Sequence, residues 1–169
     1  VISGTPTNAA VGDTTVSIIA TDTAGASITD QIVISVANTN DAPTVANELV
    51  DQTTISGRES IYTIATNSFA DVDASDTLTY SVTLEGGASV PSWLVINSTT
   101  GALTANPTAS DAGSISVTVT ATDSASSPLT AADTFTIAVT ANQTPSVTGL
   151  ANQTATEDTA VSFSLADTS

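Results

Sequence analysis

Short stretches of alternating apolar and polar residues recur along the chain. In residues 31–36, Ile32, Ile34 and Val36 fall on one face of an extended segment, which is the pattern of a half-buried strand. The apolar positions are mostly β-branched, a residue type that favours pleated surfaces. No long stretch places apolar residues at helical spacing. The pattern therefore predicts an all-β protein.

The predicted strands fall into groups separated by turn residues. Residues 15–20 and 31–36 form a pair, joined by a loop with hairpin composition at residues 23–27. The longest group predicts seven strands, at residues 50–55, 60–65, 77–83, 93–96, 102–105, 114–122 and 134–139. Seven short strands in this length fit a two-sheet sandwich with Greek-key connections. Trp93, the only tryptophan, is expected to be a core anchor between the sheets.

The chain also repeats itself. Asp123 follows Asp22 by 101 positions (123 − 22), and Pro145 follows Pro43 by 102 (145 − 43). Each proline lies in a linker between two strand groups, where it does not have to continue a central strand. We therefore expect tandem Greek-key sandwiches from a longer protein, one complete and two partial. Their boundaries are the second half of a repeat at 1–41, a complete repeat at 42–142, and the start of a third at 143–169.

Composition narrows the function classes. The chain has 17 acids and a single base, Arg58, for a net charge of −16, which disfavours nucleic acid and anionic lipid as partners. No apolar run approaches the roughly 20 residues of a membrane helix, so we expect no membrane insertion in this segment. Without His, Cys or Lys, the usual nucleophile–base arrangements cannot form. We expect no enzyme, although a carboxylate pair for glycoside hydrolysis remains formally open.

Some acids are placed as metal ligands would be. Asp71 and Asp73 are separated by one residue, Asp123 ends a predicted strand, and Asp41 lies in the first linker. Two carboxylates at this spacing can chelate one hard cation, and Ca²⁺ takes six to eight oxygen ligands. The alternative is a metal-free array whose acids only keep the protein soluble.

Four segments of the complete repeat carry a resemblance to a known family: residues 78–81 (LTYS), 91–94 (PSWL), 97–103 (NSTTGAL) and 113–123, which end in ATD. Together they resemble the dystroglycan-type cadherin-like domain of large bacterial and archaeal surface proteins. The resemblance implies that the seven-stranded Greek-key sandwich is of the cadherin or immunoglobulin-like type. The resemblance covers residues 42–142 and extends by the repeat into both partial units. It implies a calcium site at each junction between repeats.

By position, the resemblance implies two ligand sets. The first junction would use Asn40, Asp41, Asp71, Asp73 and Asp123, and the second would use Glu59, Asp111, Asn142 and Asp167. The place where the preceding domain normally supplies an acid falls near Asn8, which departs from the family pattern. Asp76 is either an outer ligand or a simple loop acid. The remaining acids considered are interpreted as solvated surface groups: Asp13, Asp30, Glu48, Asp51, Glu85 and Asp133.

These predictions suggest a mechanical function. We expect a calcium-stiffened extracellular spacer or adhesin repeat, part of a rod or filament at the cell surface. Its partners would be neighbouring repeats of the same chain and other copies in a filament or surface layer. The rival hypothesis is a carbohydrate-binding module, because sugar sites present exposed aromatic platforms beside polar groups. Solvent exposure of Trp93, or of Tyr62 together with Tyr80, would favour that rival.

Overall fold

The structure is a computed structural model and describes residues 3–145, 152, 154–160 and 162. This part of the chain contains no α-helix, and the prediction of an all-β fold is confirmed. Its elements are two short 3-10 helices and eleven strands: η1 (Asn8–Ala10), β1 (Gly12–Thr21), β2 (Ser27–Val36), β3 (Thr44–Val45), β4 (Gln52–Ile55), β5 (Ser60–Thr63), β6 (Phe69–Ala70), β7 (Thr79–Leu84), β8 (Leu94–Ile96), β9 (Ala102–Ala105), η2 (Ala109–Asp111), β10 (Gly113–Thr122) and β11 (Thr130–Thr140).

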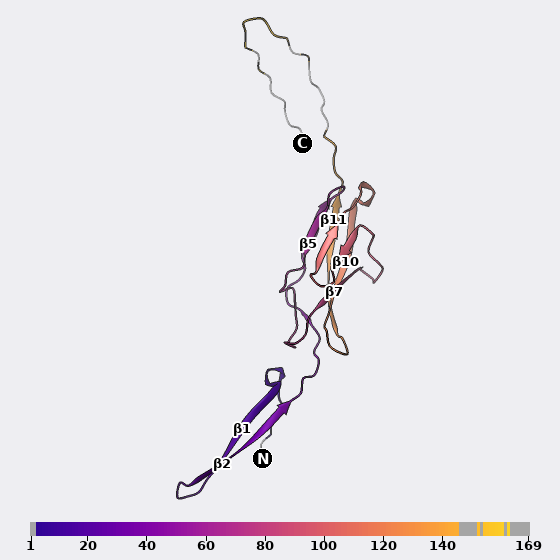
Figure 1. The fold of residues 1–169 in the computed structure, drawn as a ribbon. Helices are drawn as coiled ribbons and strands as arrows, with labels where there is room; N and C mark the ends of the chain where they lie inside the picture. The colour runs from indigo at the N-terminus through magenta and orange to yellow at the C-terminus, as the bar shows by residue number, and fades with distance from the viewer. Residues whose placement is uncertain (1–2, 146–151, 153, 161, 163–169) are drawn as a thin grey trace.

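Strands β3 to β11 form a two-layer sandwich (Figure 1). One layer is a four-stranded sheet in the order β4-β11-β10-β7, and the other is a three-stranded sheet in the order β5-β9-β8. β4 pairs in parallel with β11, whereas the other pairs in both layers are antiparallel. The chain crosses between layers after β4, β5, β7 and β9, as a Greek-key sandwich requires.

The core lies between the two layers. β10 and β11 each present alternate residues to it, so that Val117, Val119 and Ala121 are 0% exposed and Phe135 is 3% exposed. The facing sheet contributes Leu94 and Leu103, with Leu49, Ile64 and Phe69 closing the margins of the core. The period-2 burial along β10 and β11 is therefore the origin of the alternating sequence pattern.

The pair β1–β2 is a separate two-stranded hairpin, which extends away from the sandwich in Figure 1. Its register is regular from Gly12↔Val36 to Thr21↔Ser27. Ile18, Ile28 and Ile34 are 42%, 74% and 40% exposed. A pattern that predicts a half-buried strand is thus present here without a covering layer.

Two features differ from the predicted elements. The two-residue strands β3 and β6 pair with each other and are too short to show an alternating pattern. Trp93 does not begin a strand but lies in the turn before β8, where the Leu94 N–H donates to the Pro91 carbonyl (3.0 Å). This turn, which begins at a proline, delays β8 by one residue.

Candidate metal centre

The loop after β6 is shaped by its own aspartates. Asp71 Oδ1 accepts a hydrogen bond from the Asp73 N–H (2.9 Å), which is an Asx-type turn favoured by aspartate. The Asp76 N–H then donates to the Asp73 carbonyl (2.9 Å). These two bonds bend residues 71–76 so that three carboxylates leave one short loop.

Asp123 is the first residue after β10 and organises the loop that leads to β11. Its Oδ2 accepts a hydrogen bond from the Leu129 N–H (3.0 Å), and its Oδ1 accepts one from the Ala125 N–H (3.2 Å). Burial of this carboxyl raises its pKa, but hydrogen bonds from Asn40, Leu129 and Ala125 outweigh burial and hold the pKa below its ordinary value. Asp123 therefore stays ionised although only 4% of it is exposed.

The linker from the hairpin is attached to both loops. Asn40 Nδ2 donates to Asp123 Oδ2 (3.0 Å) and to the Ser127 carbonyl (3.3 Å). The next residue, Asp41, donates its backbone N–H to Asp73 Oδ2 (2.8 Å). We call η1, β1 and β2 together the hairpin unit. The Asn40–Asp41 pair thus connects the end of the hairpin unit to two acidic loops of the sandwich.

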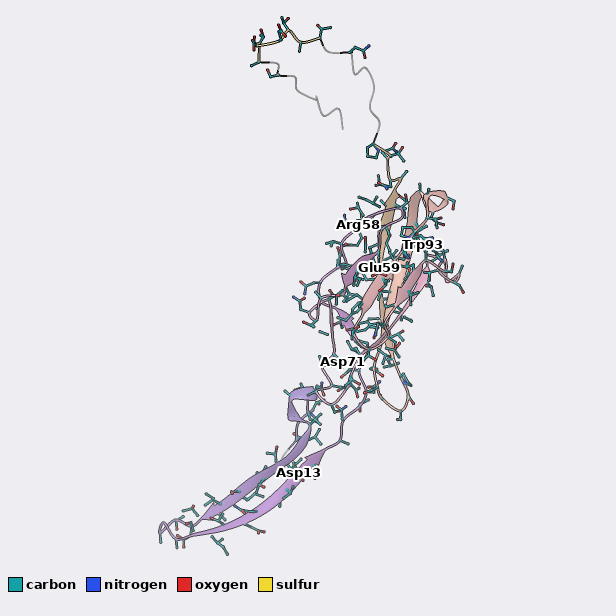
Figure 2. The ribbon with its side chains drawn as sticks, turned by 45° about the horizontal axis from the view of Figure 1, so that its top comes forward. Asp13, Arg58, Glu59, Asp71 and Trp93 are labelled. Carbon is teal, nitrogen blue, oxygen red and sulfur yellow. The ribbon has the colours of Figure 1, made fainter. Side chains whose placement is uncertain are left out.

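The acids of these loops converge. One carboxylate oxygen from each of Asp71, Asp76 and Asp123 lies within 4.8 Å of the other two. Asp71 Oδ2 and Asp73 Oδ1 are buried and have no hydrogen-bond partner, and Asp73 is only 4% exposed. Figure 2 shows Arg58, the only base, far from Asp71. Buried unpaired carboxylate oxygens are costly unless a cation or donor meets them, so this donor set fits a hard divalent ion.

The hairpin unit reaches the same loop directly. Asn8, the first residue of η1, donates its Nδ2 amide to the carbonyl of Val72 (2.9 Å). Val72 lies between Asp71 and Asp73, so a side chain from the hairpin unit contacts the backbone of the acidic loop. Asn8 lies near the position where the cadherin-like resemblance leads us to expect an acid from the preceding repeat. Its contact with Val72 is an amide–carbonyl hydrogen bond and involves no carboxylate.

Comparison with protein families identifies the sandwich. The model of the He_PIG family, described as "Putative Ig domain", matches residues 42–140, which is more than half of the chain. The chain belongs to this Ig-domain family. We refer below to residues 42–140 as the Ig domain. No curated protein sequence matches the chain.

Solved cadherin structures share the fold. Protocadherin gamma B2 (extracellular cadherin domains 1–5) matches with a TM-score of 0.64 and 20% identity over 81% of this chain and 28% of its own. Protocadherin gammaB7 (EC3–6) gives a TM-score of 0.62 and 20% identity over 79% of this chain and 34% of its own. Mouse cadherin-23 (EC22–24) gives a TM-score of 0.62 and 19% identity over 84% of this chain and 46% of its own. The chain thus spans less than half the length of each, and at this identity the likeness shows a cadherin-like, Ig-like fold.

The Ig domain brings the residues proposed for the first junction together. Asn40 contacts Asp123, and Asp41 contacts Asp73 through its backbone, while Asp71 and Asp123 belong to the converging trio. The third member of the trio is Asp76, which the sequence left open between an outer ligand and a loop acid. Its carboxylate also accepts a hydrogen bond from Ser124 Oγ (3.1 Å). The sequence does not decide between these two roles, because the position of Asp76 depends on this contact with a distant loop.

The residues proposed for the second junction are spread out. Glu59 is exposed in the connection between β4 and β5, and Asn142 is exposed and donates its N–H to Ser56 Oγ (2.9 Å). Asp167 lies outside the described residues. Among residues 3–145 and the few described beyond them, no second group of three acids comes together. A second metal site therefore remains a prediction.

Asp111, the other acid of that set, is engaged within its own turn. Its Oδ2 accepts hydrogen bonds from the Thr108 N–H (2.8 Å) and the Thr108 hydroxyl (2.6 Å), which makes a capping box for η2. These bonds, first that from the Thr108 hydroxyl, lower the pKa of Asp111, and the adjacent Trp93 side chain contributes a smaller lowering. The carboxylate is therefore fixed at the start of β10.

Two acids interpreted as solvated surface groups also have hydrogen-bond partners in the fold. Asp133 Oδ2 accepts a hydrogen bond from the Leu49 N–H (2.6 Å), and Asp51 Oδ1 accepts one from the Thr136 N–H (2.7 Å). Both bonds join the segment around β4 to β11. No local pattern predicts these bonds, because the partners are more than 80 residues apart.

The two tyrosines and the tryptophan pack at the margin of the core. Tyr62 packs beside Phe135 with ring centroids 5.8 Å apart, and Tyr80 packs beside Phe69 at 6.0 Å. These tyrosines are part of the core margin rather than a surface platform. Trp93 likewise packs against the core and is half-buried, so it anchors the margin of the core without being fully enclosed between the sheets. It lies in a turn at the margin, because the chain enters β8 one residue later than expected.

Proposed function

We propose that this chain is a calcium-stiffened extracellular spacer repeat, part of a cell-surface rod or filament that serves adhesion. The single observation that carries the proposal is the pair of buried carboxylate oxygens without partners, Asp71 Oδ2 and Asp73 Oδ1, beside the converging trio. A surface acid that only confers solubility has no reason to bury unpaired oxygens. The cadherin-like fold and the Ig-domain family support an extracellular setting.

Calcium at this junction would be held by residues from both sides of the joint. The acidic loop supplies Asp71, Asp73 and Asp76, and the loop after β10 supplies Asp123, while Asn40 and Asp41 come from the linker. A bound divalent cation would neutralise mutual repulsion among these acids. Because the linker is bonded to the same carboxylates, binding would also fix the hairpin unit relative to the Ig domain, and this makes the joint stiff.

We propose the same organisation for the whole chain, with residues 1–41 as the second half of a repeat, 42–142 as a complete repeat and 143–169 as the start of a third. The β1–β2 hairpin supports this because its register matches that of β10–β11: Val16 pairs with Ile32 as Val117 pairs with Phe135. Neighbouring repeats are then the principal partners, with other copies as lateral ones. The second junction, with Glu59, Asp111, Asn142 and Asp167, would bind calcium more weakly, because its linker has Gln143 in place of Asp41.

Calcium titration tests the proposal. The free energy of unfolding should rise by about 2.7 kcal/mol at a hundredfold excess of calcium over its dissociation constant, and small-angle scattering should show a straighter joint. The double variant Asp71→Asn, Asp73→Asn should lose both effects. A matched control, Asp30→Asn with Glu85→Gln, changes the charge equally at exposed acids away from the trio and should respond as the parent does.

The controls decide between calcium binding and a general charge effect. If the double variant stiffens at the same calcium concentration as the parent, Asp71 and Asp73 are not ligands. If the control loses the response as well, calcium acts only by screening the net charge of −16. Isothermal calorimetry on the same variants then counts the ions bound.

A further inference from the structure

A groove lies on the Ig domain away from the acidic trio. It has a volume of about 420 Å³ and is lined by residues that include Leu84, Ser89, Pro91, Trp93, Ser110 and Asp111. Figure 2 shows Trp93 toward the end of the domain opposite Asp71. The groove lies within the Ig domain, so it does not depend on how the hairpin unit is placed.

Backbone hydrogen bonds hold the turn that presents Trp93 to this groove. The turn that contains it is closed by the bond from the Leu94 N–H to the Pro91 carbonyl (3.0 Å), and the Trp93 carbonyl accepts the Asn106 N–H (2.9 Å). One part of the side chain packs on the core, and the rest remains accessible. Leu84 and Pro91 are also half-buried, so the groove has an apolar surface already ordered before any ligand binds.

Polar groups stand beside this apolar surface. Asp111 is fixed through Oδ2 by its two bonds from Thr108, and a carboxylate retains further acceptor capacity after two such bonds. The hydroxyls of Ser89 and Ser110 are on exposed residues. No lysine or arginine lines the groove. An anionic ligand would therefore meet Asp111 without a compensating base.

We infer that this groove is a binding site for a neutral saccharide. A pyranose ring has an apolar face that can stack on an indole and hydroxyls that donate to a carboxylate and exchange hydrogen bonds with serines. Such a ligand matches both the Trp93 surface and the polar groups, whereas a lysine or arginine side chain would use Trp93 and Asp111 but leave Ser89 and Ser110 unused. The groove would let a spacer repeat attach to a glycan along its length.

The only tryptophan of the chain is also the reporter for this site. Fluorescence of Trp93 is titrated with hexasaccharides of glucose (β-1,4 and β-1,3), mannose and N-acetylglucosamine, and with an oligogalacturonate as an acidic comparison. At least one neutral oligosaccharide should give a saturable change in emission. The oligogalacturonate should not.

Variants assign the binding to the groove. Asp111→Asn, which retains an acceptor for the Thr108 cap, and Ser89→Ala should each weaken binding at least severalfold by fluorescence. Trp93→Ala should abolish binding by calorimetry, and Trp93→Phe, which preserves more of the packing, should retain part of it if the alanine variant does not fold. Asp71→Asn should bind as the parent does, with calcium or with a chelator.

Three outcomes would overturn the inference: no neutral oligosaccharide binds, the acidic one binds better, or Asp111→Asn and Ser89→Ala bind unchanged. A lysine- or arginine-rich peptide that alters Trp93 emission in an Asp111-dependent manner, without any saccharide effect, would assign the groove to a cationic partner. The trio at the first junction shares no residue with the groove. Failure here therefore leaves the calcium proposal for that junction standing, and failure of calcium binding there leaves this inference standing.

Discussion

The two long hairpins of the molecule have the same sequence pattern in different surroundings. In β10–β11, Val117 faces Phe135 across the pair, and Val119 faces Asp133. In β1–β2, Val16 faces Ile32, and Ile18 faces Asp30. The equivalent positions differ by 101 along the first strand (119 − 18). The same register therefore occurs twice, down to one aspartate at the same cross-strand site.

Burial separates the two hairpins. Val119 is 0% exposed, whereas Ile18 is 42% exposed. The difference arises because β8 and β9 cover β10–β11, while no strand covers β1–β2 within the described residues. Alternation and register are thus properties of the hairpin itself, but stabilisation by burial comes from strands elsewhere in the repeat.

The largest expected effect concerns this difference in burial between the two hairpins, at the core of the Ig domain. Phe135→Ala should destabilise the Ig domain by about 3–5 kcal/mol because it removes a buried ring, which is 3% exposed here. The equivalent hairpin position across from Val16 is Ile32, which is 39% exposed. Ile32→Ala should leave the unfolding of the Ig domain unchanged. Denaturant unfolding followed by Trp93 fluorescence reports on the Ig domain alone, and equal losses in both variants would contradict the comparison.

A smaller effect is expected at the matched aspartates. Asp133 accepts the Leu49 N–H as well as the N–H of Thr134, whereas Asp30 accepts only its neighbour Gln31. Asp133→Ala would leave the Leu49 N–H without its partner in a buried residue, which costs about 1–3 kcal/mol. Asp30→Ala should change stability by less than about 0.5 kcal/mol. Thermal unfolding by circular dichroism measures both.

Much of the fold could be predicted because each long strand shows its own local alternation of apolar and polar residues. Seven of the nine strands of the Ig domain, all except the two-residue β3 and β6, follow from the alternation of apolar residues. The convergence of Asp71 and Asp123 is expected only from the family resemblance, since the two residues follow strands of different sheets. The position of Asp76 could not be predicted, because it depends on the turn from Asp73 and on Ser124 in a distant loop. The margin position of Trp93 depends on one turn that shortens β8, which no periodicity reveals.

Acid should destabilise the Ig domain through Asp123. Burial raises the pKa of Asp123, but the hydrogen bonds from Asn40, Leu129 and Ala125 lower it further than burial raises it. A carboxyl with a lowered folded-state pKa stabilises the fold above its unfolded pKa of about 4, and this stabilisation is lost as pH falls through the folded value. The metal-free parent should therefore lose stability between pH 5 and pH 3 more steeply than Asp123→Asn. Unfolding curves at both pH values, in chelator, test this.

The smallest effect is expected at the two 3-10 helices, η1 and η2. Each precedes the first strand of a hairpin, but Asp111 of η2 caps its own helix, whereas Asn8 of η1 donates to Val72 in the acidic loop. A neutral, exposed hydrogen bond is worth about 0.5–1.5 kcal/mol, so Asn8→Ala should loosen the joint without unfolding either part.

The loosening should be visible chiefly without calcium. In chelator, scattering should show a broader range of joint angles for Asn8→Ala than for the parent, and calcium should restore the parent profile because the carboxylates then hold the linker. Thr7→Ala, one residue earlier and without a side-chain cap bond, is the matched control and should behave as the parent. A joint that is equally broad in the parent and Asn8→Ala would mean that the contact with Val72 does not restrain it, and that the acidic loop and linker act alone.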